Sequence, residues 1–168
     1  MDLKRFISSV NDFPVPGIVF KDISPLLANG KALSYVVKQM AAAAADADVI
    51  VGPDARGFLF GTPVAAALEK PFVMVRKAKK LPGAVIRKTY KFEYGENALE
   101  MQRGRIQPGQ KVVIIDDILA TGGTIKAIID LIESQGATVT KIIFLMELTQ
   151  FHGINNYPNI EVVSLIKI

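Results

Sequence analysis

The sequence predicts an α/β domain whose central parallel sheet is covered by helices on both faces. Short apolar runs typical of buried strands alternate along the chain with segments of helical periodicity, and the links between them are short. The runs are almost wholly apolar, as expected for strands that are buried on both faces. With 168 residues, 50% of them hydrophobic, the chain is long enough to bury one substantial core.

The helices are predicted from apolar spacing and from propensity. One segment is rich in alanine, the residue with the highest helix propensity, and another has apolar residues at helical spacing, namely Phe58, Val64, Ala65 and Leu68. A glycine at position 136 marks the end of the last helix. The expected helices comprise residues 2–11, 30–47, 57–69 and 124–135.

The strands are predicted from β-branched runs that end in turn-forming residues, such as the Gly52-Pro53 pair after the first of them. No internal repeat and no Pro, Gly or Ser-rich linker divides the chain, so we expect residues 1–168 to form one domain. The expected strands comprise residues 49–51, 72–75, 111–115 and 139–146, with an edge strand over residues 160–166.

The composition argues against several classes of protein. The chain has no cysteine, which excludes disulfides and thiolate metal sites, and its one histidine, His152, leaves no His-rich metal site. We expect His152 to be structural. No apolar run reaches the roughly 18 residues of a membrane span, and the N-terminal stretch lacks the long apolar core of a signal peptide. A cytoplasmic protein without membrane contact is the simplest expectation.

The net charge of +4 comes from one local segment. Residues 76–91 hold no acidic residue, while the rest of the chain carries more acidic than basic side chains. A compact polyanion bound at one site explains such a concentration better than a nucleic acid bound along a face, although a solvated basic loop is the plainer alternative. The basic residues of this segment are Arg76, Lys77, Lys79, Lys80, Arg87, Lys88 and Lys91.

The stretch VVIIDDILATGGTI, residues 112–125, carries the clearest chemical signal. The adjacent carboxylates of Asp116 and Asp117 repel each other, so a positive or hydroxylated group should lie opposite them. Ligands of open α/β sheets bind at the carboxyl ends of strands, where glycines and a helix N-terminus form an anion site. The loop lacks the Gly-Lys-Ser/Thr of a Walker motif. An Asp-capped turn is the alternative, but capping needs only one Asp.

A sugar phosphate fits this pattern, because carboxylates accept hydrogen bonds from vicinal hydroxyls while the loop takes the phosphate. The stretch resembles the phosphoribosyl pyrophosphate signature of the type I phosphoribosyltransferases. That resemblance implies that the acidic pair, Asp116 and Asp117, faces the ribose and its developing positive charge. It also implies that a phosphate loop holds the ribose 5-phosphate; this loop consists of Ala120, Thr121, Gly122, Gly123 and Thr124.

Four further stretches, in the same order and at the same spacing, resemble the adenine phosphoribosyltransferase family. The implied reaction joins adenine to 5-phosphoribosyl 1-pyrophosphate to give AMP and pyrophosphate with Mg²⁺, in purine salvage by a homodimer. The implied fold is a type I phosphoribosyltransferase-like sheet with a base-binding hood (residues 1–29) and a mobile lid (residues 76–91). The stretches are FPVPGIVFKDISPLL (13–27), GPDARGFLFGTPVA (52–65), VRKAKKLPG (75–83) and YKFEYGENALEMQ (90–102).

The resemblance also assigns residues to the pyrophosphate. A lid that excludes water would protect the cationic sugar, and its basic residues would hold the leaving group, some of them across a dimer interface. The family has a cis peptide before the arginine that aligns with Arg56, and it usually has glycine where this chain has Lys79. The implied pyrophosphate-binding residues are Asp54, Ala55, Arg56, Arg76, Lys77, Lys80 and Tyr94.

For adenine, the resemblance implies that the backbone of Val19 reads the amine edge, that Phe20 stacks on the ring and that Arg56 faces the base. From its residue type alone, Phe20 could equally fill a core. Glu93 matches the family residue proposed for proton transfer, although it could instead pair with Lys91 on a surface strand. Glu100 is a weaker candidate for the same role.

Magnesium should be bound through pyrophosphate, ribose hydroxyls and water, with carboxylates only in support and no direct protein ligand. Two other functions remain open. One is a regulator that senses phosphoribosyl pyrophosphate and binds RNA or DNA through its basic segment; the Leu81-Pro82-Gly83 turn and the lack of interleaved aromatic residues argue against it. The other is the same reaction on hypoxanthine, guanine or orotate.

Overall fold

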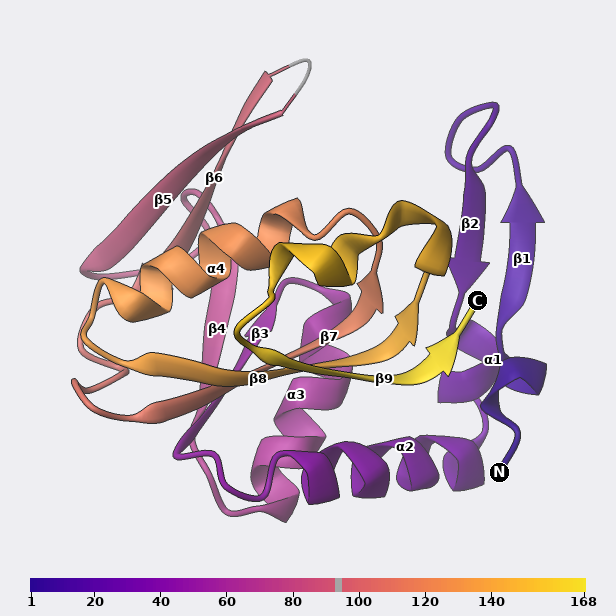
Figure 1. Ribbon diagram of the computed structural model, residues 1–168, viewed down its shortest axis with the longest axis horizontal. Coiled ribbons are helices and arrows are strands. Elements are labelled where there is room, and N and C mark those ends of the chain that lie inside the picture. The colour runs from indigo at the N-terminus through magenta and orange to yellow at the C-terminus, as the bar shows by residue number, and fades with distance from the viewer. Residues whose placement is uncertain (93–94) are drawn as a thin grey trace.

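The computed structural model describes residues 1–92 and 95–168, and its main feature is a seven-stranded sheet of order β5-β6-β4-β3-β7-β8-β9 (Figure 1). Helices cover both faces of this sheet, so the predicted α/β class is confirmed. The strands are β3 (Val49–Pro53), β4 (Phe72–Lys77), β5 (Val85–Phe92), β6 (Gly95–Gln102), β7 (Lys111–Leu119), β8 (Thr138–Glu147) and β9 (Glu161–Lys167).

Five neighbouring strands, β4, β3, β7, β8 and β9, run parallel, as predicted, and β9 is the expected edge strand. The hairpin β5–β6 extends the sheet beyond β4 with antiparallel pairing. The sequence did not predict this hairpin. Basic residues interrupt the apolar pattern of β5, and such a pattern is typical of a solvated loop. The sheet is therefore mixed, with a parallel centre.

Alternate side chains of the central strands face different helices. Ile50, Val113 and Ile115 pack with α2 (Gly30–Ala43) and α3 (Arg56–Ala67) in one buried cluster. On the opposite face, Val51 and Ile114 pack with α4 (Gly123–Glu133) in the other. Because both faces are buried, these strands need the nearly continuous apolar runs seen in the sequence.

The helix predicted over residues 2–11 is wrong. A short 3-10 turn, η1 (Leu3–Phe6), begins after Asp2, whose side chain accepts the N–H of Lys4, and β1 (Ser8–Asn11) follows it. The two serines of β1 have low helix propensity, and pairing with β2 (Val19–Asp22) decides their conformation. A short helix, α1 (Ser24–Leu27), follows β2.

The turn between β1 and β2 is closed by residues with unusual backbone conformations. Asp12 and Gly17 both have positive φ, and the Asp12 carboxylate accepts the Gly17 N–H at 2.8 Å. Phe13 and Pro14 are joined by a cis peptide. The two strands form a separate sheet that stands beside the carboxyl ends of the central strands, so the hood projects over the edge where ligands bind (Figure 1).

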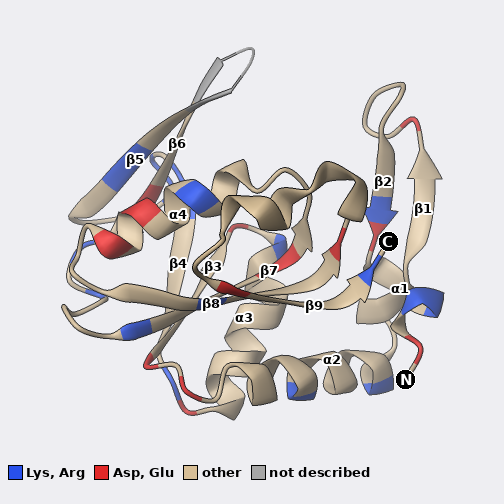
Figure 2. Ribbon diagram, viewed as in Figure 1, with Lys and Arg blue, Asp and Glu red and all other residues tan. Residues whose placement is uncertain are grey.

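The segment predicted as a mobile lid contains the end of β4, a link over residues 78–84 and most of β5. Two of its basic side chains are paired: Arg87 lies 2.5 Å from Glu100 on β6, and Lys88 lies 2.8 Å from Asp130 on α4. Figure 2 shows basic positions on β5 close to acidic ones on β6 and α4. Arg87 and Lys88 are therefore not simply solvated charges, whereas mobility of the lid stays a prediction.

Among the described residues, no helix combines the length and the apolar character needed to cross a membrane.

Candidate active site

The acidic pair lies within β7 and not beyond its end, because β7 continues past the predicted boundary at residue 115. The pairing of β7 with β3 ends at Ile114, whereas its pairing with β8 continues to Leu119. Asp116 and Asp117 therefore belong to a strand that extends beyond its neighbour. This extension carries both side chains to the open edge of the sheet.

The phosphate loop follows directly and leads into α4. Gly122 has φ 83°, a conformation open to glycine but costly for other residues, and it caps the first turn of the helix. The amides of residues 121–124 donate to no other described residue, and Thr121 and Thr124 are exposed. Unpaired amides at a helix N-terminus bind anions.

The loop and the acidic pair line one cavity of about 330 Å³, together with the segment before α3. The structure thus brings the predicted phosphate loop, acidic pair and Asp54-Ala55-Arg56 segment into one site. The cavity is lined by Pro53, Asp54, Ala55, Arg56, Asp116, Asp117, Ile118, Leu119, Ala120, Thr121, Gly122, Gly123, Thr124 and Ile125.

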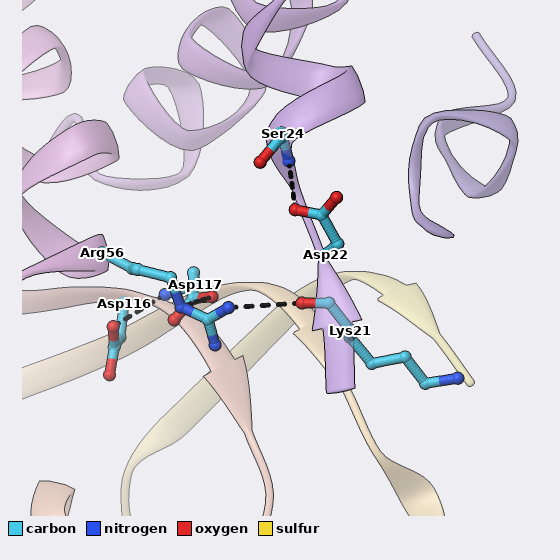
Figure 3. Close-up of polar contacts among 6 residues, drawn as sticks. All are labelled: Lys21, Asp22, Ser24, Arg56, Asp116 and Asp117. Atoms are coloured by element: carbon cyan, nitrogen blue, oxygen red, sulfur yellow. Dashed lines mark hydrogen bonds and ion pairs between the residues drawn. The ribbon is translucent and has the colours of Figure 1, made fainter. Parts of the chain in front are cut away.

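Arg56 is the positive group opposite the acidic pair (Figure 3). Its Nε lies 2.8 Å from Oδ2 of Asp117, and its Nη1 donates to the backbone carbonyl of Lys21 at 3.2 Å. The guanidinium carbon also lies 5.1 Å from the ring centre of Phe20. One side chain therefore joins the acidic pair to the hood, with a cation–π contact in between.

The two aspartates differ in their electrostatic surroundings. Burial raises the pKa of Asp116 well above its ordinary value, and the negative charge of Asp117 raises it further. Burial also raises the pKa of Asp117, but Arg56 opposes that shift. Arg56 therefore favours the ionised form of Asp117, while Asp116 is the easier of the two to protonate.

Oδ1 of Asp116 accepts the backbone N–H of Asp117 at 2.8 Å. Oδ2 of Asp117 lies in ion-pair range of Arg56 but accepts no aligned hydrogen bond from the described residues. The acidic pair thus retains acceptor capacity that a ligand with hydroxyl groups can use.

The hood presents Phe20 to the site and not to a core. Phe20 is half-buried and packs edge-on against Phe13, with ring centres 5.2 Å apart, while Val19 next to it is half exposed. The interpretation of Phe20 as a core residue is therefore wrong. An aromatic ring beside Arg56 and the acidic pair is suited to contact with a flat heterocycle.

The segment before α3 has the backbone that the resemblance implies: the peptide between Asp54 and Ala55 is cis. The Asp54 carboxylate lies 2.8 Å from Nε of Arg76, at the end of β4. Arg76 in turn donates to the carbonyl of Lys80 at 3.1 Å. The start of the lid is thus tied to the rim of the cavity through Arg76.

Lys77 and Lys80 are exposed and have no ion-pair partner within the described part of the chain. Lys79, which stands where the family usually has glycine, has φ 66°, a left-handed conformation that glycine adopts without strain. Its N–H donates to the Glu100 carboxylate at 2.9 Å. A tertiary contact therefore stabilises the turn in the absence of glycine.

Glu100 is 1% exposed, and both of its oxygens are bound, one by the Lys79 N–H and one by the Arg87 guanidinium. The hydrogen bond from Arg87 lowers the pKa of this carboxyl. Glu100 is also absent from the lining of the cavity. It is therefore an anchor of the lid turn, and its alternative assignment to proton transfer is wrong.

Glu93 and Tyr94 lie outside the described residues, so their predicted roles stay predictions. His152 has a left-handed backbone between two 3-10 turns and does not line the cavity. Two contacts of the site had no signal in the sequence. One is the Lys21 carbonyl that receives Arg56, and the other is the contact of Asn156 and Tyr157 with the back of the phosphate loop.

The site fits a metal ion only in part. Among residues 1–92 and 95–168, no group of three or more His, Cys, Asp or Glu side chains is placed to hold a metal ion. The acidic pair supplies hard oxygen ligands of the kind that Mg²⁺ prefers, but it cannot surround the ion. A magnesium ion here would take most of its ligands from substrate oxygens and water.

Comparisons with known proteins show the family of the chain. Residues 21–156 match the family model of the phosphoribosyl transferase domain. The chain is 64% identical to adenine phosphoribosyltransferase of Mycoplasmopsis pulmonis over 168 residues, which cover 100% of this chain and 99% of the relative.

Solved structures agree as well. The crystal structure of adenine phosphoribosyltransferase from Thermoanaerobacter pseudethanolicus matches with a TM-score of 0.94 and 46% identity, covering 99% of this chain and 98% of the other. The Trypanosoma brucei enzyme, in complex with AMP, pyrophosphate and ribose-5-phosphate, matches with a TM-score of 0.90 and 27% identity, covering 98% and 77%. Fold, signature loop and acidic pair define a phosphoribosyl transferase domain. Within that class, the chain belongs to the adenine phosphoribosyltransferase family.

Proposed function

We propose that the protein transfers the 5-phosphoribosyl group from 5-phosphoribosyl 1-pyrophosphate to adenine, giving AMP and pyrophosphate in purine salvage. The observation that carries this proposal is the arrangement around Arg56. This residue joins the hood to the acidic pair above one cavity that is also lined by the phosphate loop, and Arg76 ties the start of the lid to Asp54 on the rim of the same cavity. A base, a ribose and two phosphate groups each have a complementary surface there.

The phosphate loop is suited to the ribose 5-phosphate. Its unpaired amides and the N-terminus of α4 attract a dianion, and both threonine hydroxyls can donate to it. A phosphate fixed there would place the ribose ring towards the acidic pair, which lies on β7 shortly before the loop. The 2- and 3-hydroxyls would then donate to carboxylate oxygens.

The acidic pair also suits the chemical step. When the bond between C1 of the ribose and pyrophosphate breaks, positive charge develops on the ribose ring, and a fixed carboxylate beside it lowers the barrier. Asp117 is the better placed of the two, because Arg56 favours its ionised form. Arg56 would turn from Asp117 towards the base and the leaving pyrophosphate when substrates enter.

Recognition of adenine is assigned to the hood. In the described structure β2 pairs only with β1, so its second backbone edge is free to bind a ligand, and Lys21 already accepts a hydrogen bond there. The backbone of Val19, on the same strand, would read the exocyclic amine while Phe20 covers the ring. Glu93 remains our candidate for removing the N9 proton of adenine.

We further propose that the enzyme uses Mg²⁺, acts as a homodimer and works in the cytoplasm. When bound with pyrophosphate, the ion would neutralise part of the leaving group's charge. Support for it comes from the acidic pair, which can assist but not replace substrate oxygens. The dimer rests on the resemblance, which implies lid contacts between subunits. The cytoplasmic location rests on the lack of cysteine.

The proposal is tested by AMP and pyrophosphate formation from adenine and 5-phosphoribosyl 1-pyrophosphate, with and without a chelator. Asp117→Asn is the matched variant, because it keeps the volume and removes the charge. We expect AMP formation by the wild-type protein, loss of activity with the chelator, and a loss in kcat on the order of 100-fold in the folded variant. Salt-sensitive RNA binding without AMP formation would instead favour the regulator.

A further inference from the structure

Behind the phosphate loop lies a segment that the reaction does not itself use. This supporting segment, residues 148–157, follows β8 and contains the turns η2 (Thr149–Phe151) and η3 (Gly153–Asn156). It contacts four consecutive backbone carbonyls, those of residues 119–122, while none of its own residues lines the cavity that contains the phosphate loop. Because the four contacts follow one another along the chain, we expect them to serve the same function.

The first two contacts fix the start of the loop. The N–H of Leu148 donates to the carbonyl of Leu119 at 2.8 Å. The carbonyl of Ala120 lies against Gly153, where an added Cβ would come within 2.0 Å of the oxygen. Gly153 is therefore required by this close approach, and no side chain fits between the loop and the supporting segment.

The next two contacts come from side chains. Nδ2 of Asn156 donates to the carbonyl of Thr121 at 2.7 Å, and the hydroxyl of Tyr157 donates to the carbonyl of Gly122. Tyr157 is only 4% exposed and packs into the core beside α4, so its hydroxyl has a fixed position. Burial also raises the pKa of Tyr157 to about 12, so its hydroxyl, already protonated at neutral pH, remains a donor in alkaline solution as well.

Peptide geometry links these contacts to the ligand. In a trans peptide, the C=O of one residue and the N–H of the next point in opposite directions. A hydrogen bond that holds the carbonyl of Thr121 against the supporting segment turns the N–H of Gly122 towards the cavity. The carbonyl of Gly122 accepts the N–H of Lys126 at 3.2 Å in the first turn of α4, and the Tyr157 hydroxyl adds a second donor to the same oxygen, so that both contacts orient the N–H of Gly123. These are amides that a phosphate at the N-terminus of α4 would accept.

We propose that Asn156 and Tyr157 are positioning residues for the ribose 5-phosphate, because they orient the amides of the phosphate loop without touching the ligand. The inference rests on the proposed function of that loop. A loop whose amides are oriented in advance loses less entropy when the phosphate binds. Removal of either contact should therefore weaken phosphate binding and leave the base site unchanged.

The test measures the affinity for ribose 5-phosphate by calorimetry, and the KM values for both substrates, in Tyr157→Phe and Asn156→Ala. Two control variants are matched in chemistry: Tyr35→Phe on α2 and Asn155→Ala in the same turn, whose side chains make no hydrogen bond to another described residue. Each test variant should weaken ribose 5-phosphate binding, and raise the KM for phosphoribosyl pyrophosphate, about three- to tenfold. The KM for adenine and the control variants should stay within about twofold of the wild type.

Ribose 5-phosphate binding by both folded test variants with the wild-type affinity would overturn the inference, even if their melting temperatures fell. That result would leave the two side chains a purely structural role. Failure of the proposed function looks different, because then the wild-type protein itself would neither bind ribose 5-phosphate nor form AMP.

Discussion

Arg56 explains why the chain tolerates two adjacent carboxylates. The sequence predicts a positive or hydroxylated group opposite Asp116 and Asp117, but nothing in the sequence identifies it, since Arg56 lies about 60 residues earlier. The fold brings the two together at the carboxyl ends of β3 and β7, which are parallel neighbours. The chemistry of the partner was thus predictable, while its identity depended on strand order.

Burial and the negative charge of Asp117 destabilise the ionised form of Asp116. Its folded-state pKa is raised, so the folded protein retains a proton that the unfolded chain has already lost at intermediate pH. The wild-type protein therefore loses stability as pH rises from the ordinary carboxyl range through the raised pKa. Asp116→Asn removes this titration and keeps an oxygen to accept the Asp117 N–H.

We expect Asp116→Asn to melt at a higher temperature than the wild type at pH 8, by roughly 2–4 °C for each kcal/mol of relief. The difference should shrink as the pH falls to the ordinary carboxyl range and should vanish below it, where the unfolded wild type is protonated as well. Thermal unfolding of both ligand-free proteins across this pH range measures the effect. A variant that is less stable than the wild type at pH 8 would show that the carboxylate is a stabilising charge.

At the scale of elements, prediction succeeded for strands buried on both faces and failed where pairing overrides local pattern. The strands at residues 49–53, 72–77 and 138–147 follow apolar runs, which need no partner information to be recognised. The hood and the hairpin β5–β6 carry polar or basic residues, and only antiparallel pairing makes them strands. Segments at the edges of the fold were therefore the least predictable.

The basic residues of the predicted lid, residues 76–91, are divided between structure and binding. Arg76 and Arg87 are engaged with Asp54 and Glu100, whereas Lys77 and Lys80 have no ion-pair partner among the described residues. If the two lysines hold pyrophosphate, their loss should weaken substrate binding without loosening the fold. Their freedom from internal ion pairs is what a ligand-binding role requires.

We expect Lys77→Ala and Lys80→Ala each to raise the KM for phosphoribosyl pyrophosphate about tenfold, with a much smaller change for adenine, because the charge acts on the leaving group. Lys38→Ala, an exposed site on α2, is the control. Arg87→Ala is unsuitable as a control because it would leave Glu100 buried without its charged partner. Steady-state kinetics with each substrate varied in turn provides the measurement. Equal effects of all three lysines would contradict a specific role of the lid.

At the scale of the molecule, the sheet holds together three groups of residues that are far apart in the sequence. The central parallel strands present the acidic pair and the phosphate loop at one edge, the hood stands beside that edge, and the hairpin β5–β6 extends the sheet beyond β4 (Figure 1). The parallel core could be predicted from apolar runs. The position of the hood over the site could not, because it depends on tertiary contacts such as the hydrogen bond of Arg56 to the Lys21 carbonyl and the burial of Leu3, Ile23 and Leu26 in the core.

The central claim is that this arrangement selects adenine, and a competition assay tests it most directly. Equal, subsaturating concentrations of adenine and hypoxanthine are supplied with 5-phosphoribosyl 1-pyrophosphate, and the ratio of the two nucleotide products gives the ratio of kcat/KM values. The hood backbone would accept the amine of adenine but would face the carbonyl of hypoxanthine, a mismatch that costs about 1–3 kcal/mol when buried. We therefore predict that AMP exceeds the hypoxanthine nucleotide by at least about tenfold. Equal amounts of the two nucleotides would contradict the account.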